Sequence, residues 1–330
     1  MVTLASLTPA ATAARLGGEG LRIRTGPFGV CLRSRLPAVA EGLRRLYDHM
    51  PLLAPADMAD FTVSIGPGRG LRRWVRPQAC FEYDGQRVFE PLPEAHAFAL
   101  LEWAMNWCIS AHAHQFLLIH AAVLERGGLA LVMPAPPGSG KSTLCAALSL
   151  SGWRLLSDEL ALIDPASGLV WPLCRPISLK NQSIEIVRAL SPAAVFSRVV
   201  DGTSKGSVAH MRVGDAAVAQ MDQPARPGWV VFPRYAAGAP TELTGRQRAA
   251  TVIELSRNSF NIGVLGEPGF HGLVDWVAAS QCFDFRYSSL PEALACFDQL
   301  ARRGADHPAA ASACPPPISP AGTGLPVPAA

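Results

Sequence analysis

A glycine-rich stretch between two apolar segments constrains the fold of this chain more than any other feature. The stretch reads Ala135-Pro136-Pro137-Gly138-Ser139-Gly140-Lys141-Ser142 and continues with Thr143. It follows the pattern G-x-x-x-x-G-K-[ST], with Ala135 in place of the first glycine. An apolar run at residues 129–133 precedes it, and a helix-like segment at 141–150 follows it. The sequence therefore predicts a strand, a tight loop and a helix in this order.

Loops of this kind bind nucleotide phosphates for a physical reason. Backbone N–H groups of small residues curl around the β-phosphate, a lysine reaches the β- and γ-phosphate oxygens, and a hydroxyl ligates Mg²⁺. Because the loop opens a helix, the phosphates also meet its partially positive N-terminus. We therefore expect residues 135–143 to bind ATP, with Lys141 on the phosphates and Ser142 on Mg²⁺. The alternative is a glycine turn that merely precedes a helix.

A second polar motif, Ser157-Asp158-Glu159, follows a strand predicted at residues 153–156. If a right-handed crossover returns this strand to the same sheet, the two carboxylates lie at the same sheet edge as the glycine-rich loop. A carboxylate there can ligate Mg²⁺ or accept a proton from an attacking hydroxyl. We expect Asp158 and Glu159 to be catalytic and metal-binding residues. The alternative is a solvated turn after a strand.

A histidine in an apolar strand is placed near this site by strand register. Apolar runs at residues 116–125 and 129–134 flank Arg126-Gly127-Gly128, a pattern typical of a hairpin. Pairing about the glycines sets His120 opposite residues 133–135, at the base of the glycine-rich loop. There His120 could form a hydrogen bond with Asp158 and tune its basicity. The alternative is a satisfied core histidine.

Composition excludes several classes of protein. The net charge is only +3 over 330 residues, so the broad basic surface that nucleic-acid binding usually needs is not expected. Eight cysteines show no CxxC or Cys/His ligand spacing, which argues against zinc and disulfides and favours a reducing compartment. The sequence has neither a signal peptide pattern nor an apolar window of about 18 residues. We expect a cytoplasmic protein that binds neither nucleic acid nor membrane.

The expected fold class is α/β, with three parts along the chain. Residues 1–110 have the pattern of a small α+β region, with a hairpin that turns at Asp84-Gly85 and a helix from about residue 93. Residues 111–304 have the pattern of an α/β domain that contains the glycine-rich loop. The proline- and alanine-rich residues 305–330 are typical of a disordered tail. The helix after residue 93 could pack on either of the first two parts.

Three of these segments together carry a family resemblance. They are Ile119-His120-Ala121-Ala122, residues 135–143 and Trp153-Arg-Leu-Leu-Ser-Asp158-Glu159. The combination resembles HPr serine kinase/phosphorylase and its PEP-carboxykinase-like P-loop fold. It is similar, more closely, to a family of HPr kinase-related proteins, whose members also have segments like residues 175–181, 203–210, 231–235 and 258–261. The resemblance covers about residues 60–300.

The resemblance implies roles for individual residues. Asp158 matches the acidic residue thought to take the proton of the substrate hydroxyl, and His120 matches the histidine that supports it. Glu159 stands where HPr kinase has a second aspartate, and Thr143 stands where it typically has glutamate. Both departures change the expected metal ligands and weaken a role in phosphorylating HPr itself. We also expect three basic residues to clamp developing phosphate charge; these are Lys180, Lys205 and Arg234.

The function that the resemblance implies is an ATP- and Mg²⁺-dependent kinase that phosphorylates a serine hydroxyl on a small protein or peptide partner. A nucleotide-gated binding module that hydrolyses ATP slowly is the second hypothesis, and a small-molecule phosphotransferase is the third. HPr kinase is an oligomer, so the resemblance also implies self-association.

Overall fold

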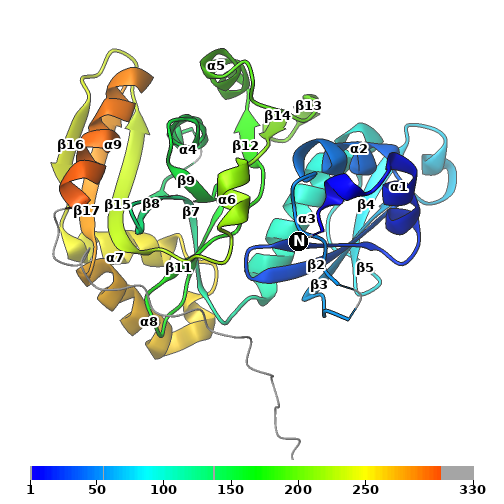
Figure 1. Cartoon of the computed structure of the whole chain (residues 1–330), viewed down its shortest axis with the longest axis horizontal. Helices are drawn as coiled ribbons and strands as arrows, with labels where there is room; N and C mark the ends of the chain where they lie inside the picture. The colour runs from blue at the N-terminus through cyan, green and yellow to red at the C-terminus, as the bar shows by residue number, and fades with distance from the viewer. Residues whose placement is uncertain (1, 55, 137, 306–330) are drawn as a thin grey trace, which may run out of the picture.

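The computed structural model of this chain describes residues 2–54, 56–136 and 138–305 (Figure 1). Over these residues the chain is a mixed α/β structure whose sheets combine parallel and antiparallel strands. The expected α/β class is therefore confirmed. Residues 306–330, where a disordered tail is predicted, lie outside the described residues. Among the residues that are described, none of the helices is long and apolar enough to cross a membrane.

The N-terminal part is built around a six-stranded sheet of order β1-β2-β3-β4-β5, with β6 paired to β4. Its elements are η1 (Leu4–Ser6), α1 (Pro9–Gly17), β1 (Leu21–Thr25), β2 (Phe28–Ser34), α2 (Pro37–Leu46), β3 (Phe61–Pro67), η2 (Gly70–Arg73), β4 (Gln78–Tyr83), β5 (Gln86–Arg87), β6 (Leu92–Pro93), η3 (Glu94–His96) and α3 (Ala97–His112). Asp84 and Gly85 join β4 to β5 in the left-handed conformation, at φ +48° and +75°. The predicted Asp-Gly hairpin is therefore confirmed.

Helix α3 lies on the side of the N-terminal sheet that faces the rest of the molecule (Figure 1). Its apolar residues Leu101, Met105 and Cys108 are buried in the core that this sheet shares with the larger one. The helix also contacts β14, and its polar residues Glu102 and Asn106 meet the segment before β12. The helix thus packs on both parts and crosses the boundary predicted near residue 110.

The remainder of the chain is organised by an eight-stranded sheet of order β11-β10-β7-β8-β15-β17-β16, with β9 also paired to β7. Its strands and covering helices are β7 (Leu117–Arg126), β8 (Leu129–Pro134), α4 (Lys141–Leu150), β9 (Arg154–Ser157), β10 (Leu160–Ile163), β11 (Val170–Trp171), β15 (Arg226–Tyr235), β16 (Glu242–Gly245), α7 (Arg248–Arg257), α8 (Ile262–Ala278), β17 (Gln281–Tyr287) and α9 (Leu290–Ala305). Helices α4 and α9 pack on one face and α7 and α8 on the other, so every residue of β8 is buried.

A three-stranded antiparallel sheet of order β12-β14-β13 stands between α4 and the N-terminal part (Figure 1). This region comprises β12 (Ile177–Lys180), α5 (Gln182–Leu190), β13 (Val200–Thr203), β14 (Gly206–Met211) and α6 (Asp215–Ala219). Buried apolar residues of all three sheets form one continuous core. The small sheet can therefore position side chains against both α3 and the large sheet.

The hairpin of β7 and β8 fixes the register near the glycine-rich loop. Gly127 and Gly128 form its two-residue turn at φ +63° and +80°, as a type I′ turn requires. Ala121 pairs with Pro134, so His120 stands opposite Ala135, the first residue of the loop. The predicted hairpin and register are confirmed.

Strand β9 runs antiparallel to β7, as β8 does, so the carboxyl ends of β8 and β9 meet at one edge of the sheet. This confirms the expected placement of the acidic motif, with β7 lying between the two strands. After β9 the chain bends at Asp158 and Glu159 and continues along β7 as β10. The acidic pair therefore occupies a bend between two collinear strands.

Candidate functional site

The glycine-rich loop, residues 135–140, joins β8 to α4 at this edge of the sheet; its Pro137 lies outside the described residues. Gly138 and Gly140 both adopt φ +85°, a conformation that favours glycine. A Cβ on Gly140 would lie 2.5 Å from the Tyr287 Oη and 3.1 Å from the Tyr235 Cβ. The Tyr287 hydroxyl donates a hydrogen bond to the Gly140 carbonyl at 3.2 Å. Neighbouring strands thus hold the loop at the N-terminus of α4.

Three side chains meet where α4 begins. Lys141 is the first residue of α4, and its Nζ lies 3.2 Å from the His120 Nε2. The same Nε2 lies 3.1 Å from the Glu159 Oε2. One ring nitrogen cannot accept from the ammonium and donate to the carboxylate at once. The His120 Nε2 therefore forms a hydrogen bond with only one of Lys141 and Glu159 at a time.

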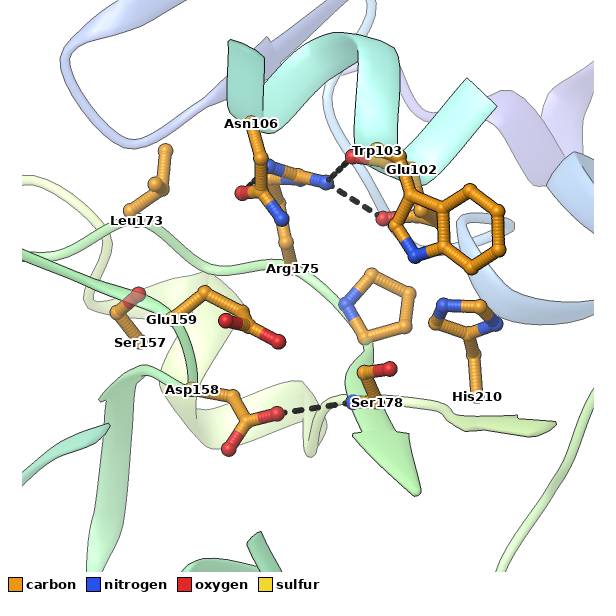
Figure 2. Close-up of a pocket in the computed structure, with 11 residues that line it drawn as sticks. Glu102, Trp103, Asn106, Ser157, Asp158, Glu159, Leu173, Arg175, Ser178 and His210 are labelled. Atoms are coloured by element: carbon orange, nitrogen blue, oxygen red, sulfur yellow. Dashed lines mark hydrogen bonds and ion pairs between the residues drawn. The ribbon is translucent and has the colours of Figure 1, made fainter. Parts of the chain in front are cut away.

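The expected hydrogen bond between His120 and Asp158 is not formed, because His120 contacts Glu159 instead. The bend at residues 158–159 breaks the regular alternation of side chains along a strand, which lets the Glu159 side chain turn toward His120. The Asp158 carboxylate is held elsewhere, since its Oδ2 accepts a hydrogen bond from the Ser178 N–H at 2.9 Å (Figure 2).

Asp158 is almost completely buried, with 4% of its surface exposed. Burial raises the pKa of its carboxyl group to about 6, and the neighbouring Glu159 charge adds to this shift. Lys141 and the Ser178 N–H oppose it. A carboxyl group with this pKa can exchange a proton near neutral pH.

Glu159 is shifted in the other direction. Burial opposes its ionisation, but the hydrogen bond from His120 and the charge of Lys141 prevail and lower its pKa to about 2. Its side chain keeps 27% of its surface exposed. Glu159 is therefore a permanent anion that solvent or a ligand can reach. Two adjacent carboxyl groups with opposite pKa shifts are suited to different tasks, one as a proton acceptor and one as a fixed negative charge.

The only three lysines of the sequence gather around this pair. Lys141 and Lys180 lower the pKa of both carboxyl groups by their charge. The pKa of Lys205 is lowered by burial and then by the Lys180 charge, while Glu159 opposes that shift. All three ammonium groups thus act on Glu159. The predicted positions of Lys180 and Lys205 near the site are confirmed.

The remaining predicted residues lie at the edges of the site. Ser142 and Thr143 are half-buried in the first turn of α4. Arg234 is exposed on β15, one residue before Tyr235, whose N–H donates to the Ser139 carbonyl at 2.9 Å. The structure places Arg234 beside the loop and shows no contact between it and the carboxyl pair among the described residues. Its role as a clamp stays a prediction.

The oxygen atoms at this site have the chemistry that suits Mg²⁺. The Asp158 Oδ1 is buried without a hydrogen-bond partner among the described residues. Glu159 is ionised and accessible, and Ser142 supplies a hydroxyl on α4. Mg²⁺ prefers oxygen ligands and usually takes one or two carboxylates, with water and phosphate oxygens completing the shell. Within the described part of the chain, no group of three or more His, Cys, Asp or Glu side chains could hold a metal. A bound phosphate would therefore have to complete the shell.

A small cavity of about 20 Å³ lies behind the carboxyl pair, between it and α3 (Figure 2). It is lined by Glu102, Trp103, Asn106, Ser157, Asp158, Glu159, Leu173, Arg175, Pro176, Ser178 and His210. The apolar periodicity of α3 indicates Trp103 as a core residue, whereas the structure places it on the cavity wall. The sequence does point to part of the cavity wall, because Arg175, Ser178 and His210 fall in segments that carry the family resemblance.

No model of a known protein family matches this chain, and no curated protein matches it either.

Proposed function

We propose that this chain is an ATP-dependent kinase with a P-loop domain of the HPr kinase type, and that it transfers the γ-phosphoryl group to a hydroxyl. One observation carries the proposal. The glycine-rich loop, Lys141 and two carboxyl groups with opposite pKa shifts meet at one sheet edge. Phosphoryl transfer needs these parts together, namely an anion cradle, a cation, a metal-binding carboxylate and a proton acceptor.

Each residue then has a distinct task. The loop N–H groups and Lys141 hold the nucleotide phosphates, and Ser142 and Glu159 hold Mg²⁺, which neutralises phosphate charge when bound. Asp158 accepts the proton of the acceptor hydroxyl. His120 holds Glu159 in place, and it loses its contact with Lys141 when that ammonium turns toward the bound phosphates. Lys180 and Lys205 stabilise the charge that develops during transfer.

The proposed setting follows the family resemblance. The acceptor is a serine on a small protein or peptide partner, the compartment is the cytoplasm, and the chain self-associates. Seven cysteines in the described residues are free, as a reducing compartment allows.

The first experiment is calorimetric titration of the protein with ATP in the presence and absence of Mg²⁺. We expect Mg²⁺-dependent binding that Lys141→Ala abolishes, because no other ammonium belongs to the loop. Arg87→Ala, an exposed position on β5, removes one positive charge elsewhere and serves as the control. If the wild-type protein binds no nucleotide, the proposal fails.

A nucleotide-gated binding module is the second candidate, and one observation favours it. His120 is bound to Glu159 and leaves Asp158 without the histidine support that the family resemblance implies. Such a protein would form a persistent ATP-dependent complex with its partner and yield no phosphorylated product. Phosphate incorporation into the partner, followed by mass spectrometry, distinguishes the two functions.

A further inference from the structure

A loop that is both basic and apolar joins β3 to β4 in the N-terminal part of the chain. Its residues 69–76, called here the arginine–tryptophan loop, read Arg-Gly-Leu-Arg-Arg-Trp-Val-Arg and include no acidic residue. All of them are exposed, and the exposed fractions of Leu71, Trp74 and Val75 are 81%, 77% and 61%. Single exposed apolar side chains are normal, whereas several together mark a contact site.

Backbone hydrogen bonds hold the base of this loop. The Gly68 N–H donates to the Gln78 carbonyl at 2.7 Å, and the Glu94 N–H donates to the Pro77 carbonyl at 2.9 Å. Gly68 is buried, and the pairing of β3 with β4 ends next to it. The base of the loop is therefore fixed to the sheet, while residues 69–76 extend into solvent.

One helical turn brings the apolar side chains of the loop together. The Leu71 carbonyl accepts hydrogen bonds from the N–H groups of Trp74 and Val75, at 3.0 and 2.9 Å. Residues three and four positions apart lie on one side of a helical turn, so these three side chains form one apolar surface. The Arg73 guanidinium carbon lies 5.6 Å from the centre of the Trp74 ring, which places a positive charge beside this surface.

Most arginines of the loop have no acidic partner. Arg69 forms an ion pair with Glu82 at 2.9 Å. Arg72, Arg73 and Arg76 form no ion pair within the described part of the chain. A guanidinium group binds a carboxylate through two parallel hydrogen bonds, and Arg and Trp are prominent among the residues that carry the energy of protein interfaces. The loop is therefore suited to carboxylates that flank an apolar side chain.

Carboxylates at the base of the loop limit the extent of its basic surface. Glu82 on β4 pairs with Arg69, and the Glu94 backbone is bonded to Pro77. The turn between β4 and β5 adds the exposed Asp84. A membrane surface or a nucleic acid strand would extend over these negative charges, whereas a short polypeptide segment would not. The small net charge of +3 likewise gives no broad basic surface for either.

We propose that the arginine–tryptophan loop docks an acidic segment of a partner protein, in which carboxylates stand on both sides of an apolar side chain. The carboxylates bind the three arginines that lack an ion pair, and the apolar side chain packs against Leu71 and Trp74. The contact needs no nucleotide, because the loop shares no residue with the proposed nucleotide site. It therefore stands independently of the proposed function.

Peptides of simple composition test this docking site. A fluorescein-labelled peptide of repeated Glu-Asp-Leu triplets is titrated with the full-length protein, and its fluorescence anisotropy is measured. We expect it to bind at least about tenfold more tightly than repeated Glu-Asp-Ser or Lys-Lys-Leu triplets, since the former loses the buried leucine and the latter has the wrong charge. Trp74→Ala should weaken binding at least about tenfold, and Arg72→Glu combined with Arg73→Glu should abolish it.

Two matched controls should bind the Glu-Asp-Leu peptide as the wild-type protein does. Phe270→Ala removes an exposed aromatic ring on α8, and Arg302→Glu combined with Arg303→Glu reverses two adjacent exposed arginines on α9. Thermal unfolding and ATP binding should be unchanged in the loop variants, so a failure of the docking site and a failure of the proposed function are separate results.

Three results would overturn the docking site. They are equal binding of the three peptides, an unchanged affinity in Trp74→Ala, and an unchanged affinity in the variant with both loop arginines reversed. Vesicles of phosphatidylserine and phosphatidylcholine are titrated in parallel. If they bind in a manner that requires Trp74 while the Glu-Asp-Leu peptide does not bind, the loop is a lipid contact and the proposal fails.

Discussion

At the scale of single residues, the adjacent carboxyl groups of Asp158 and Glu159 differ in pKa because the chain bends between two strands. The bend leaves Asp158 buried against the Ser178 N–H and turns Glu159 toward His120. Burial raises the pKa of Asp158, whereas the hydrogen bond from His120 and nearby positive charge lower the pKa of Glu159. The local backbone thus separates a proton acceptor from a fixed anion within two consecutive positions.

The pH dependence of phosphoryl transfer should reflect Asp158. Transfer requires the ionised carboxylate, whose pKa is about 6. The rate should therefore rise about tenfold per pH unit below 6 and become constant above 7. Asp158→Asn should reduce transfer at least about a hundredfold, whereas Asp164→Asn, in the turn after β10, should not. Transfer rates measured from pH 5 to 8 check this, and a flat profile between 5 and 7 would exclude the role.

The same burial should cost folding stability. The unfolded Asp158 carboxyl titrates near pH 4, and the folded one titrates at about 6. Between these values the folded state binds the proton more tightly, so stability falls as pH rises and the full penalty is present at pH 7. Asp158→Asn keeps an acceptor for the Ser178 N–H and should gain about 1–3 kcal/mol at pH 7. Urea denaturation at pH 7 and pH 4 measures the difference, which should vanish at pH 4; a loss at pH 7 contradicts the argument.

At the scale of elements, the junction of β8 and α4 depends on Gly140. Alanine there would be strained in the left-handed backbone conformation and would also collide with Tyr287 and Tyr235. We expect Gly140→Ala to cost about 2–3 kcal/mol of stability and to weaken nucleotide binding. Gly152→Ala, at φ +91° with open space around it, introduces only the backbone strain and is the matched control. Thermal unfolding compares them, and equal losses would show that the tyrosine contacts do not matter.

Local elements of this site could be predicted because short-range chemistry fixes them. Gly127 and Gly128 determine the turn, the turn determines the register of β7 and β8, and the register places His120 at Ala135. The partner of His120 could not be predicted. It depends on the bend at residues 158–159, where strand alternation fails. The periodicity of apolar residues predicts regular elements and gives no information about side-chain direction at such bends.

At the scale of the whole molecule, the N-terminal part supports the site through α3. Glu102 accepts hydrogen bonds from Arg175 and from the Tyr47 hydroxyl, both at 2.7 Å, deep in the shared core. Arg175 is 73 positions beyond Glu102 in the chain. No local pattern joins residues so far apart, which explains why the cavity and its wall on α3 were beyond prediction from the sequence.

This buried pair provides the final prediction. Glu102→Leu leaves the Arg175 charge buried without a counter-ion and should cost about 3–5 kcal/mol, whereas adding Arg175→Met should recover most of the loss. The exposed pair of Arg198 and Glu41 also joins early and late segments, at 2.8 Å, and its removal should cost less than about 1 kcal/mol. Urea denaturation of Glu102→Leu, of the buried double variant and of a variant without the exposed pair measures these losses. If the buried double variant is as unstable as Glu102→Leu alone, packing rather than charge pairing holds α3 against the site.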